Sequence, residues 1–155
     1  MHYKIELTQA QPAWIAVVRD RVQAHELSRF VPAACGEVWN FIRAANLPKP
    51  GRHVAVYLDA MGTVEVGAEV SGKFAGNERV HCSQLPAGHA VTTTHYGPYA
   101  GLAAAHAAIR SWCAKHGHPC SAVSWEVYGH WEENWSADAS KIRTDVFYLL
   151  KDATV

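Results

Sequence analysis

Glu126 lies in the middle of the apolar segment SAVSWEVYG, residues 121–129, and is the first candidate for chemistry. β-Branched and aromatic residues between Pro119 and Gly129 predict a strand. A carboxylate inside such a strand is costly unless a partner or a ligand compensates its charge. Glu126→Gln is then expected to leave stability unchanged or to raise it, because an unpaired carboxylate is removed. A solvated glutamate on an outward strand face is the alternative.

Length and charge limit the classes of protein to consider. The chain has 155 residues, enough for one domain with a sizeable core, and carries 14 basic against 14 acidic side chains. It has no run of Lys and Arg that would track phosphates. The stretch MHYKIELTQ does not resemble a signal peptide, and no apolar run approaches the roughly 20 residues of a membrane span. We expect a cytoplasmic protein with no direct nucleic-acid partner and no membrane partner.

The cysteines and histidines carry no recognisable metal signature. The four cysteines include no CxxC pair, and Cys35 and Cys113 fall on apolar faces of predicted helices. This pattern favours buried, reduced thiols. His116, His118 and Cys120 invite a metal interpretation, but no second ligand cluster has zinc spacing. We therefore expect no metal and no cofactor.

Two pairs of similar segments indicate an internal duplication. PAWIAV at residues 12–17 is matched by PAGHAV at 86–91, and HVAVY at 53–57 is matched by SWEVY at 124–128. Two copies at a long period indicate a duplicated domain and not a solenoid. We expect a single domain, residues 1–155, with repeats at about 1–75 and about 76–152.

The first half contains two strands, a helix and two further strands. The strands are predicted at residues 4–8, 14–22, 54–58 and 64–70. The helix is predicted from about Pro32 to Ala45, with Pro32 in its first turn, where its missing N–H costs nothing. Its apolar stripe includes Val38, Trp39 and Ile42, which recur at helical spacing.

The second half repeats this order and sets the fold class. Its strands are predicted at residues 80–84, 89–96, 123–128 and 144–150. Its helix begins near Pro98 and ends at Gly117. We predict an α+β fold of two β-α-β-β halves, each with an extra leading strand, related by a pseudo-twofold axis. The antiparallel sheet would carry both helices on one side and a ligand groove on the other.

Side-chain alternation predicts the direction of Glu126. Residues i and i+2 of a strand share a face, so Ser124, Glu126 and Tyr128 point to the same side. This side is the more polar one, so we expect it to face away from the helices. Tyr57 on the matching strand is expected on the same side.

Further acidic and aromatic residues are expected on that open side. On strand 64–70 the alternating valines would face the helix and Glu65 would face away. By analogy with Glu65, Asp145 and Phe147 on the last strand would join Glu126. Carboxylates among aromatic rings suit an apolar molecule that carries a positive charge.

A resemblance to a known family follows from several segments. LPAGHAVTTTHYGPY at 85–99, with Gly101-Leu102 and a helix ending in His116-Gly117, resembles the GyrI-like small-molecule-binding family. That family also supplies effector-binding domains of AraC-type and multidrug-sensing transcription regulators. VAVYLD at 54–59, WEVY at 125–128 and TDVF at 144–147 fit its strand motifs. The resemblance covers essentially the whole chain. Because no helix-turn-helix precedes the domain, a free-standing member is expected.

The resemblance implies roles for individual residues. Glu126 matches a groove glutamate that contacts cationic or polar ligand atoms, Asp145 a second acidic position and Phe147 an aromatic one. The long segment 129–143 carries two tryptophans, and we expect one of them to cover the groove mouth. Packing on the sheet edge or on a second subunit is the alternative. The predicted ligand-binding residues are Tyr57, Tyr96, Glu126, Tyr128, Trp131, Trp135, Asp145 and Phe147.

The leading hypothesis is binding of a small amphipathic or cationic compound, with toxic compounds included. The resemblance also implies an enzymatic alternative, a hydrolase of cyclopropane-containing DNA-alkylating compounds. Glu126 would then be the general base, and Tyr128 would polarise the ligand's carbonyl. A protein-binding module of the gyrase-inhibitor type is a further alternative. The sequence names neither the ligand nor the oligomeric state, and a homodimer is left open.

Overall fold

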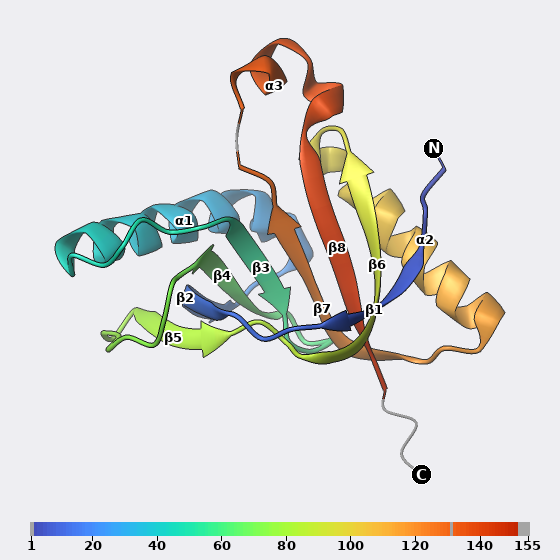
Figure 1. The fold of residues 1–155 in the computed structure, drawn as a ribbon, viewed down its shortest axis with the longest axis horizontal. Coiled ribbons are helices and arrows are strands. Elements are labelled where there is room, and N and C mark those ends of the chain that lie inside the picture. Colours follow the sequence, from blue (N-terminus) through green and yellow to red (C-terminus); the bar gives the residue numbers. More distant parts are fainter. Residues whose placement is uncertain (1, 131, 152–155) are drawn as a thin grey trace.

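Eight strands form one antiparallel sheet in the computed structural model of the protein, in the order β1-β6-β8-β7-β3-β4-β2-β5 (Figure 1). The structure describes residues 2–130 and 132–151. The strands are β1 (Glu6–Ala10), β2 (Trp14–Arg21), β3 (His53–Tyr57), β4 (Thr63–Glu69), β5 (Val80–Gln84), β6 (Gly88–Tyr96), β7 (Cys120–Tyr128) and β8 (Arg143–Leu150). The predicted strands are all present, with ends that differ by up to three residues.

The strand order has an internal symmetry. Replacing β1–β4 by β5–β8, and the reverse, returns the same order read backwards. The leading strands are exchanged, because β1 pairs with β6 and β5 pairs with β2. The pattern of apolar residues did not predict this exchange. That residues 1–75 and 76–152 superpose by a rotation stays a prediction.

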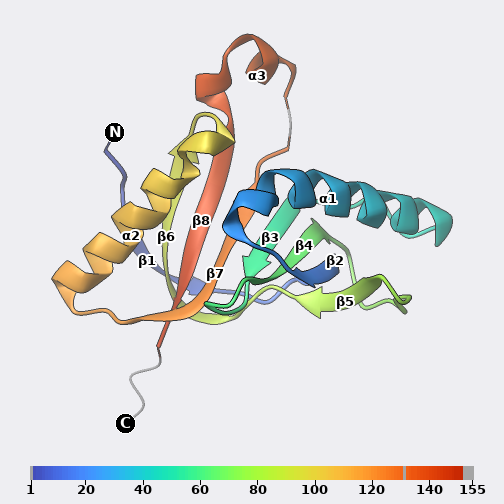
Figure 2. The ribbon, with the colours of Figure 1, turned by 180° about the vertical axis from the view of Figure 1, so that it is seen from behind.

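Two helices cover one side of the sheet. They are α1 (Leu27–Ala44), preceded by the 3-10 turn η1 (Ala24–Glu26), and α2 (Leu102–His116), preceded by η2 (Tyr99–Gly101). The view from behind in Figure 2 shows both helices in front of the strands. Apolar side chains of α1 bury against alternate residues of β4, and those of α2 bury against β6 and β8. The prediction of two helices on one side is confirmed.

Two details of α1 differ from the prediction. The helix begins five residues before Pro32, so this proline lies inside it and not in its first turn. Leu27, Phe30 and Val31 pack against the core, and their burial stabilises the extra turn despite the hydrogen bond that Pro32 cannot donate. Trp39, expected in the apolar stripe, is 40% exposed.

Much of the side of the sheet without helices is buried. Ile15, Val17, Val54, Val56 and Trp125 form a buried cluster there, drawn from strands of both halves. Trp125 stacks on Phe147 with ring centroids 5.1 Å apart. Side chains from the two halves thus fill much of the space on this side, and a ligand groove there stays a prediction.

The long β7–β8 connection contains a short helix and a turn, α3 (Glu133–Ala137) and η3 (Ala139–Lys141). Figure 1 shows this connection projecting beyond the ends of the strands. Among the helices of the described residues, none is long and apolar enough to cross a lipid bilayer.

Candidate functional site

Glu126 points toward the helices and not away from them, which corrects the predicted direction. Its carboxylate Oε2 lies 2.6 Å from Nε2 of His106 on α2. Ala55, its direct partner on β3, packs in the cluster beneath α1. Alternation could not decide the direction because both faces of β7 are buried, with Trp125 2% and Glu126 4% exposed.

Three donors converge on the Glu126 carboxylate. The hydroxyls of Tyr57 and Tyr128 donate to Oε1 at 3.1 and 2.5 Å. His106 holds the other oxygen. Hydrogen bonds to both oxygens of a buried carboxylate offset the cost of burying it. For Glu126 they come from Tyr57 and His106, remote in sequence, and from Tyr128 on its own strand.

The contacts of His106 extend to two further residues. Its Nδ1 lies 2.7 Å from the Tyr148 hydroxyl, which accepts a hydrogen bond from Arg110 Nη1 at 2.8 Å. A carboxylate can only accept, so the network assigns a proton to Nε2 of His106. When the ring is neutral, Nδ1 accepts from Tyr148. We call Tyr57, His106, Glu126, Tyr128 and Tyr148 the Glu126 site.

The phenols of this site are held in their neutral form. Burial raises the pKa of Tyr57 and of Tyr128, and the charge of Glu126 raises both further. Burial also raises the pKa of Tyr148, although Arg110 opposes this effect. Near neutral pH these hydroxyls are therefore hydrogen-bond donors, and none of them adds negative charge.

The segment HYGPY, residues 95–99, positions an aromatic ring beside the site. Gly97 has φ 135°, a conformation that favours glycine. The His95 ring bonds to the Pro98 carbonyl at 3.0 Å and to the Tyr3 hydroxyl at 2.8 Å, which fixes the turn that leads into η2. Tyr99 in η2 then packs edge-on against Tyr128, with ring centroids 5.6 Å apart. Tyr99 is 46% exposed, so this aromatic pair joins the site to the surface.

The Glu126 site lies where neither helix backbone covers the sheet. The main backbone contacts of α1 are with β2, β4 and β5, and those of α2 are with β6 and β8. The central strands β3 and β7 lie between the two helices, as Figure 2 shows. Thr144 faces the same side opposite Tyr128. Its buried Oγ1 has no hydrogen-bond partner among the described residues.

Three predicted ligand-binding residues lie on the opposite side of the sheet. Glu126 pairs with Val146 across the β7–β8 ladder, so Asp145 and Phe147 must point the other way. The pairing of Thr94 with Asp145 places Tyr96, two residues further along β6, on that side too. The structure brings Tyr57, Glu126 and Tyr128 together and separates these three residues from them.

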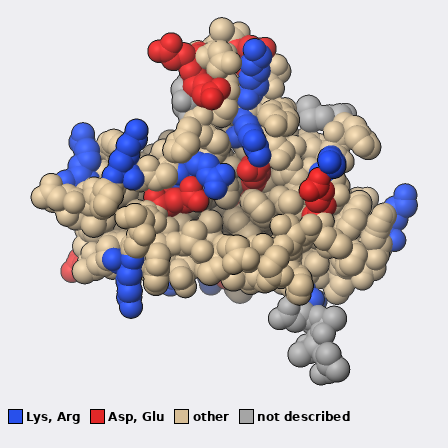
Figure 3. Space-filling model, viewed as in Figure 1, with Lys and Arg blue, Asp and Glu red and all other residues tan. Residues whose placement is uncertain are grey.

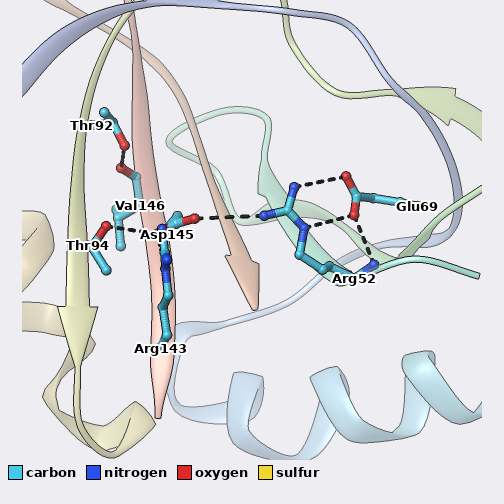
Figure 4. A network of polar contacts seen from close by, with 7 residues as sticks. All are labelled: Arg52, Glu69, Thr92, Thr94, Arg143, Asp145 and Val146. Atoms are coloured by element: carbon cyan, nitrogen blue, oxygen red, sulfur yellow. Dashed lines mark hydrogen bonds and ion pairs between the residues drawn. The ribbon is translucent and has the colours of Figure 1, made fainter. Parts of the chain in front are cut away.

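Asp145 belongs to a network of charged groups on its own side. It accepts hydrogen bonds from Thr94 at 2.9 Å and from Arg143 at 3.2 Å, and lies 3.9 Å from Arg52 (Figure 4). Arg52 also holds Glu69 at 3.0 Å. Burial raises the pKa of Glu69, but the hydrogen bonds from Arg52 outweigh it and leave this pKa lowered. The two arginines and the two carboxylates of this network balance one another in charge.

The two tryptophans of the β7–β8 connection have different outcomes. Trp135 on α3 is 7% exposed. A Cβ at Gly129 would lie 3.0 Å from its Cη2, so its ring packs at the base of its own loop. That Trp135 covers the Glu126 site stays a prediction, as does its packing on the sheet edge or on a second subunit. Trp131 lies outside the described residues.

Sequence reasoning missed His106, Tyr148, Tyr99 and Arg110. The separation of four residues between His106 and Arg110 was the available signal, because it places two polar side chains one turn apart on the same helix face. They flank the buried residues Ala105 and Ile109. Tyr148 was hidden in the apolar pattern of β8.

The surface outside the Glu126 site carries charges of both signs on the face drawn in Figure 3. Figure 3 shows basic and acidic side chains close together, with no large area of one sign in that view. A cavity of about 500 Å³ lies at the C-terminal end of α2, lined by Arg110, Cys113, Ala114, Gly117, His118, Pro119 and Cys120. None of the predicted ligand-binding residues lines it. Within residues 2–130 and 132–151, no group of three His, Cys, Asp or Glu side chains is arranged to hold a metal.

Comparison with known proteins identifies the family. A family model for the GyrI-like small molecule binding domain matches residues 3–147. The chain therefore belongs to the GyrI-like family. No protein of curated function matches the sequence.

Solved structures share the fold at low sequence identity. The C-terminal domain of EcmrR has a TM-score of 0.76 and 22% identity over 97% of this chain and 99% of that one. In a complex of EcmrR with DNA the TM-score is 0.75 at 20% identity, and the match covers 96% of this chain and 57% of the EcmrR chain. SAV2435 bound to tetraphenylphosphonium matches with a TM-score of 0.61 and 10% identity over 98% and 95% of the two chains. A hydrolase from Listeria innocua matches with a TM-score of 0.60 and 9% identity over 96% and 92%.

Proposed function

We propose that this GyrI-like domain binds small amphipathic cations at the Glu126 site. The observation that carries the proposal is the buried Glu126 carboxylate, ringed by aromatic side chains and placed on the central strands between the two helices. Its family binds small molecules, and one structural neighbour is described bound to tetraphenylphosphonium. A large apolar cation combines the two properties that such a site recognises, rings for stacking and a charge to neutralise.

Entry of the ligand requires side chains to move. Glu126 is 4% exposed, so Tyr99 and Tyr128 must turn away before a molecule reaches the carboxylate. Tyr99 is half exposed, and its edge-on contact with Tyr128 is a weak one of about 0.5–1.5 kcal/mol. A ligand ring that stacks in the same place restores this contact, and the bound cation compensates the hydrogen bond that Tyr128 withdraws from Glu126.

The test compares a cation with a neutral molecule of similar shape. Tetraphenylphosphonium and triphenylphosphine oxide are titrated into the protein and into Glu126→Gln by calorimetry. A charge-assisted contact is worth roughly 1.5–3 kcal/mol, so the variant should lose about tenfold to a hundredfold in affinity for the cation. Its affinity for the neutral molecule should change much less. Equal losses for both molecules would contradict the charge role of Glu126.

Hydrolysis is the second candidate, favoured by the 2.6 Å contact of an imidazole with the Glu126 carboxylate. A carboxylate and an imidazole at this distance can relay a proton from an attacking water. Against it, both oxygens of Glu126 already accept hydrogen bonds from protein groups, so a water would have to displace one of these donors. Incubation with a panel of cyclopropane-containing electrophiles, followed by mass spectrometry, separates turnover from binding of the unchanged compound.

A further inference from the structure

His106 can take up a second proton without breaking the network around it. The proton would go to Nδ1, which faces the Tyr148 hydroxyl at 2.7 Å. A hydroxyl both donates and accepts, so the Tyr148 oxygen can accept from Nδ1–H as well as from Arg110. The Tyr148 hydrogen can then turn to Ser124, its direct partner across the β7–β8 ladder. The contact with Glu126 becomes an ion pair in this state.

The other titratable groups that face His106 and Glu126 hold a constant charge near neutral pH. Arg110 on α2 is a permanent cation. Burial raises the pKa of each phenol and thiol here: Tyr57 on β3, Tyr128 on β7, Tyr148 on β8, Tyr99 in η2 and Cys35 on α1, the last to about 11. An imidazole is the side chain whose charge changes between about pH 5 and 8.

We infer that His106 makes cation binding at Glu126 proton-linked, so that a bound cation and the second proton of His106 exclude one another. Both would place a positive charge against the same buried carboxylate. When the cation binds, the proton on Nδ1 leaves for solvent, and the neutral ring keeps its Nε2–H bond to Glu126. The inference rests on the proposed function and adds a residue that regulates the same site.

The linkage has a definite sign. Acidification loads His106 with its second proton and opposes the cation, so affinity for the cation falls as pH falls. One linked proton limits the slope to about tenfold in affinity per pH unit, and the same coupling makes the cation oppose protonation. A neutral ligand has no charge to exclude the proton, so its affinity should change little with pH. Release of a cationic ligand on acidification is the consequence.

The experiment is calorimetric titration of the full chain with tetraphenylphosphonium between pH 5 and 8. Neither this cation nor triphenylphosphine oxide titrates, so a change in affinity with pH belongs to the protein. Wild type should bind the cation more weakly as pH falls, while the affinity of His106→Gln for the cation should not depend on pH. Repeating the titration in buffers of different ionisation enthalpy counts the protons released and needs no variant. Nitrogen NMR of the imidazoles should show that the cation removes the proton from Nδ1 of His106 and leaves the one on Nε2.

Failure of the inference and failure of the proposed function give different results. If wild type binds the cation equally well at every pH and releases no proton, the linkage is wrong and the proposed function stands. The linkage through His106 is also wrong if His106→Gln keeps the pH dependence, or if the NMR signals place the proton of the neutral ring on Nδ1. If wild type binds neither probe at any pH, the proposed function is wrong and the linkage with it.

Discussion

Glu126 lies directly opposite Ala55 in the β3–β7 ladder, where the two halves of the sheet meet. Corresponding positions in β3 and β7 thus hold a methyl group in the first half and a carboxylate in the second. Tyr57 and Tyr128 flank this pair symmetrically, and each donates to the single carboxylate. The backbone and the two tyrosines are therefore arranged almost symmetrically, but the charge is not. The carboxylate comes from one half only, and α2 alone supplies its imidazole partner.

Replacing Glu126 by Gln should lower the free energy of unfolding, contrary to the expectation from sequence for an unpaired carboxylate. Gln keeps one acceptor oxygen, but its amide N–H groups oppose the Nε2–H of His106 or a tyrosine hydroxyl. A buried donor left without an acceptor costs about 1–3 kcal/mol. Urea denaturation measures the change. Tyr57→Phe, which removes only the 3.1 Å bond, is the control and should cost less; a Gln variant as stable as wild type would contradict the described network.

The buried phenols should make the fold sensitive to alkali. The pKa of Tyr57 and of Tyr128 is raised in the folded state by burial and then by Glu126. Unfolded tyrosines ionise near pH 10, so the contribution is complete below about pH 10 and is lost as pH rises beyond it. Stability measured between pH 9 and 12 should fall less steeply in the Tyr57→Phe, Tyr128→Phe double variant. Tyr96→Phe, at a residue 52% exposed, is the control. An unchanged slope in the double variant would show that these phenols ionise as in the unfolded chain.

Two glycines should respond to alanine with opposite signs. A Cβ at Gly67 would lie 1.8 Å from the carbonyl oxygen of Ala16 in the paired strand, so Gly67→Ala must push β2 and β4 apart. We expect a loss of about 3 kcal/mol or more, at the upper end of overpacking. A Cβ at Gly36, inside α1, would meet nothing within 4 Å. Gly36→Ala should therefore gain about 0.5–1 kcal/mol from helix propensity. Thermal unfolding of both variants against wild type checks the signs.

Arg52 should contribute stability that disappears in acid. The pKa of Glu69 is raised by burial but lowered more by Arg52, with a lower value as the net result. Its contribution is therefore present above the unfolded value near about 4.5 and is lost as pH falls below it. The Arg52 side chain is 42% exposed, so screening keeps the effect below about 1 kcal/mol. Urea midpoints at pH 7 and pH 3 should differ less in Arg52→Met than in wild type. Arg143→Met, which removes a partner of Asp145 but none of Glu69, should keep most of the wild-type difference.

The sequence predicts secondary structure well here because apolar residues recur at the period of a strand or of a helix in most elements. The alternating Val64, Val66 and Ala68 of β4 pack beneath α1 as expected. Residues 120–128 defeat the same reasoning because both faces of β7 are buried, so polarity no longer marks the outside. The start of α1 was predicted too late, at Pro32, because tertiary packing outweighs the hydrogen bond that this proline cannot donate.

The candidate site was predicted only in part, because its partners come together through the fold. Glu126 stands out locally, as an ion in an apolar strand. His106 lies 20 residues away on α2 and Tyr57 lies 69 residues away on β3. No short segment of the sequence predicts that these elements pack together. The error of face concerns Glu126 and the tyrosines beside it, which point toward the helices, while Asp145 and Phe147 lie on the side without helices.

The exchange of leading strands has a consequence for how the chain reaches its native state. β1 leaves the ribosome well before its partner β6, which ends at Tyr96. The backbone N–H and C=O groups of β1 therefore stay hydrated until β6 is available to pair with them, when well over half of the chain has been made. Neither half can close its sheet while the other is missing, so folding is expected to be slow, dominated by contacts between distant residues, and all-or-none. A nascent chain stalled before β6 would present β1 and the uncovered edge of β2 together, and would be a natural client for chaperones.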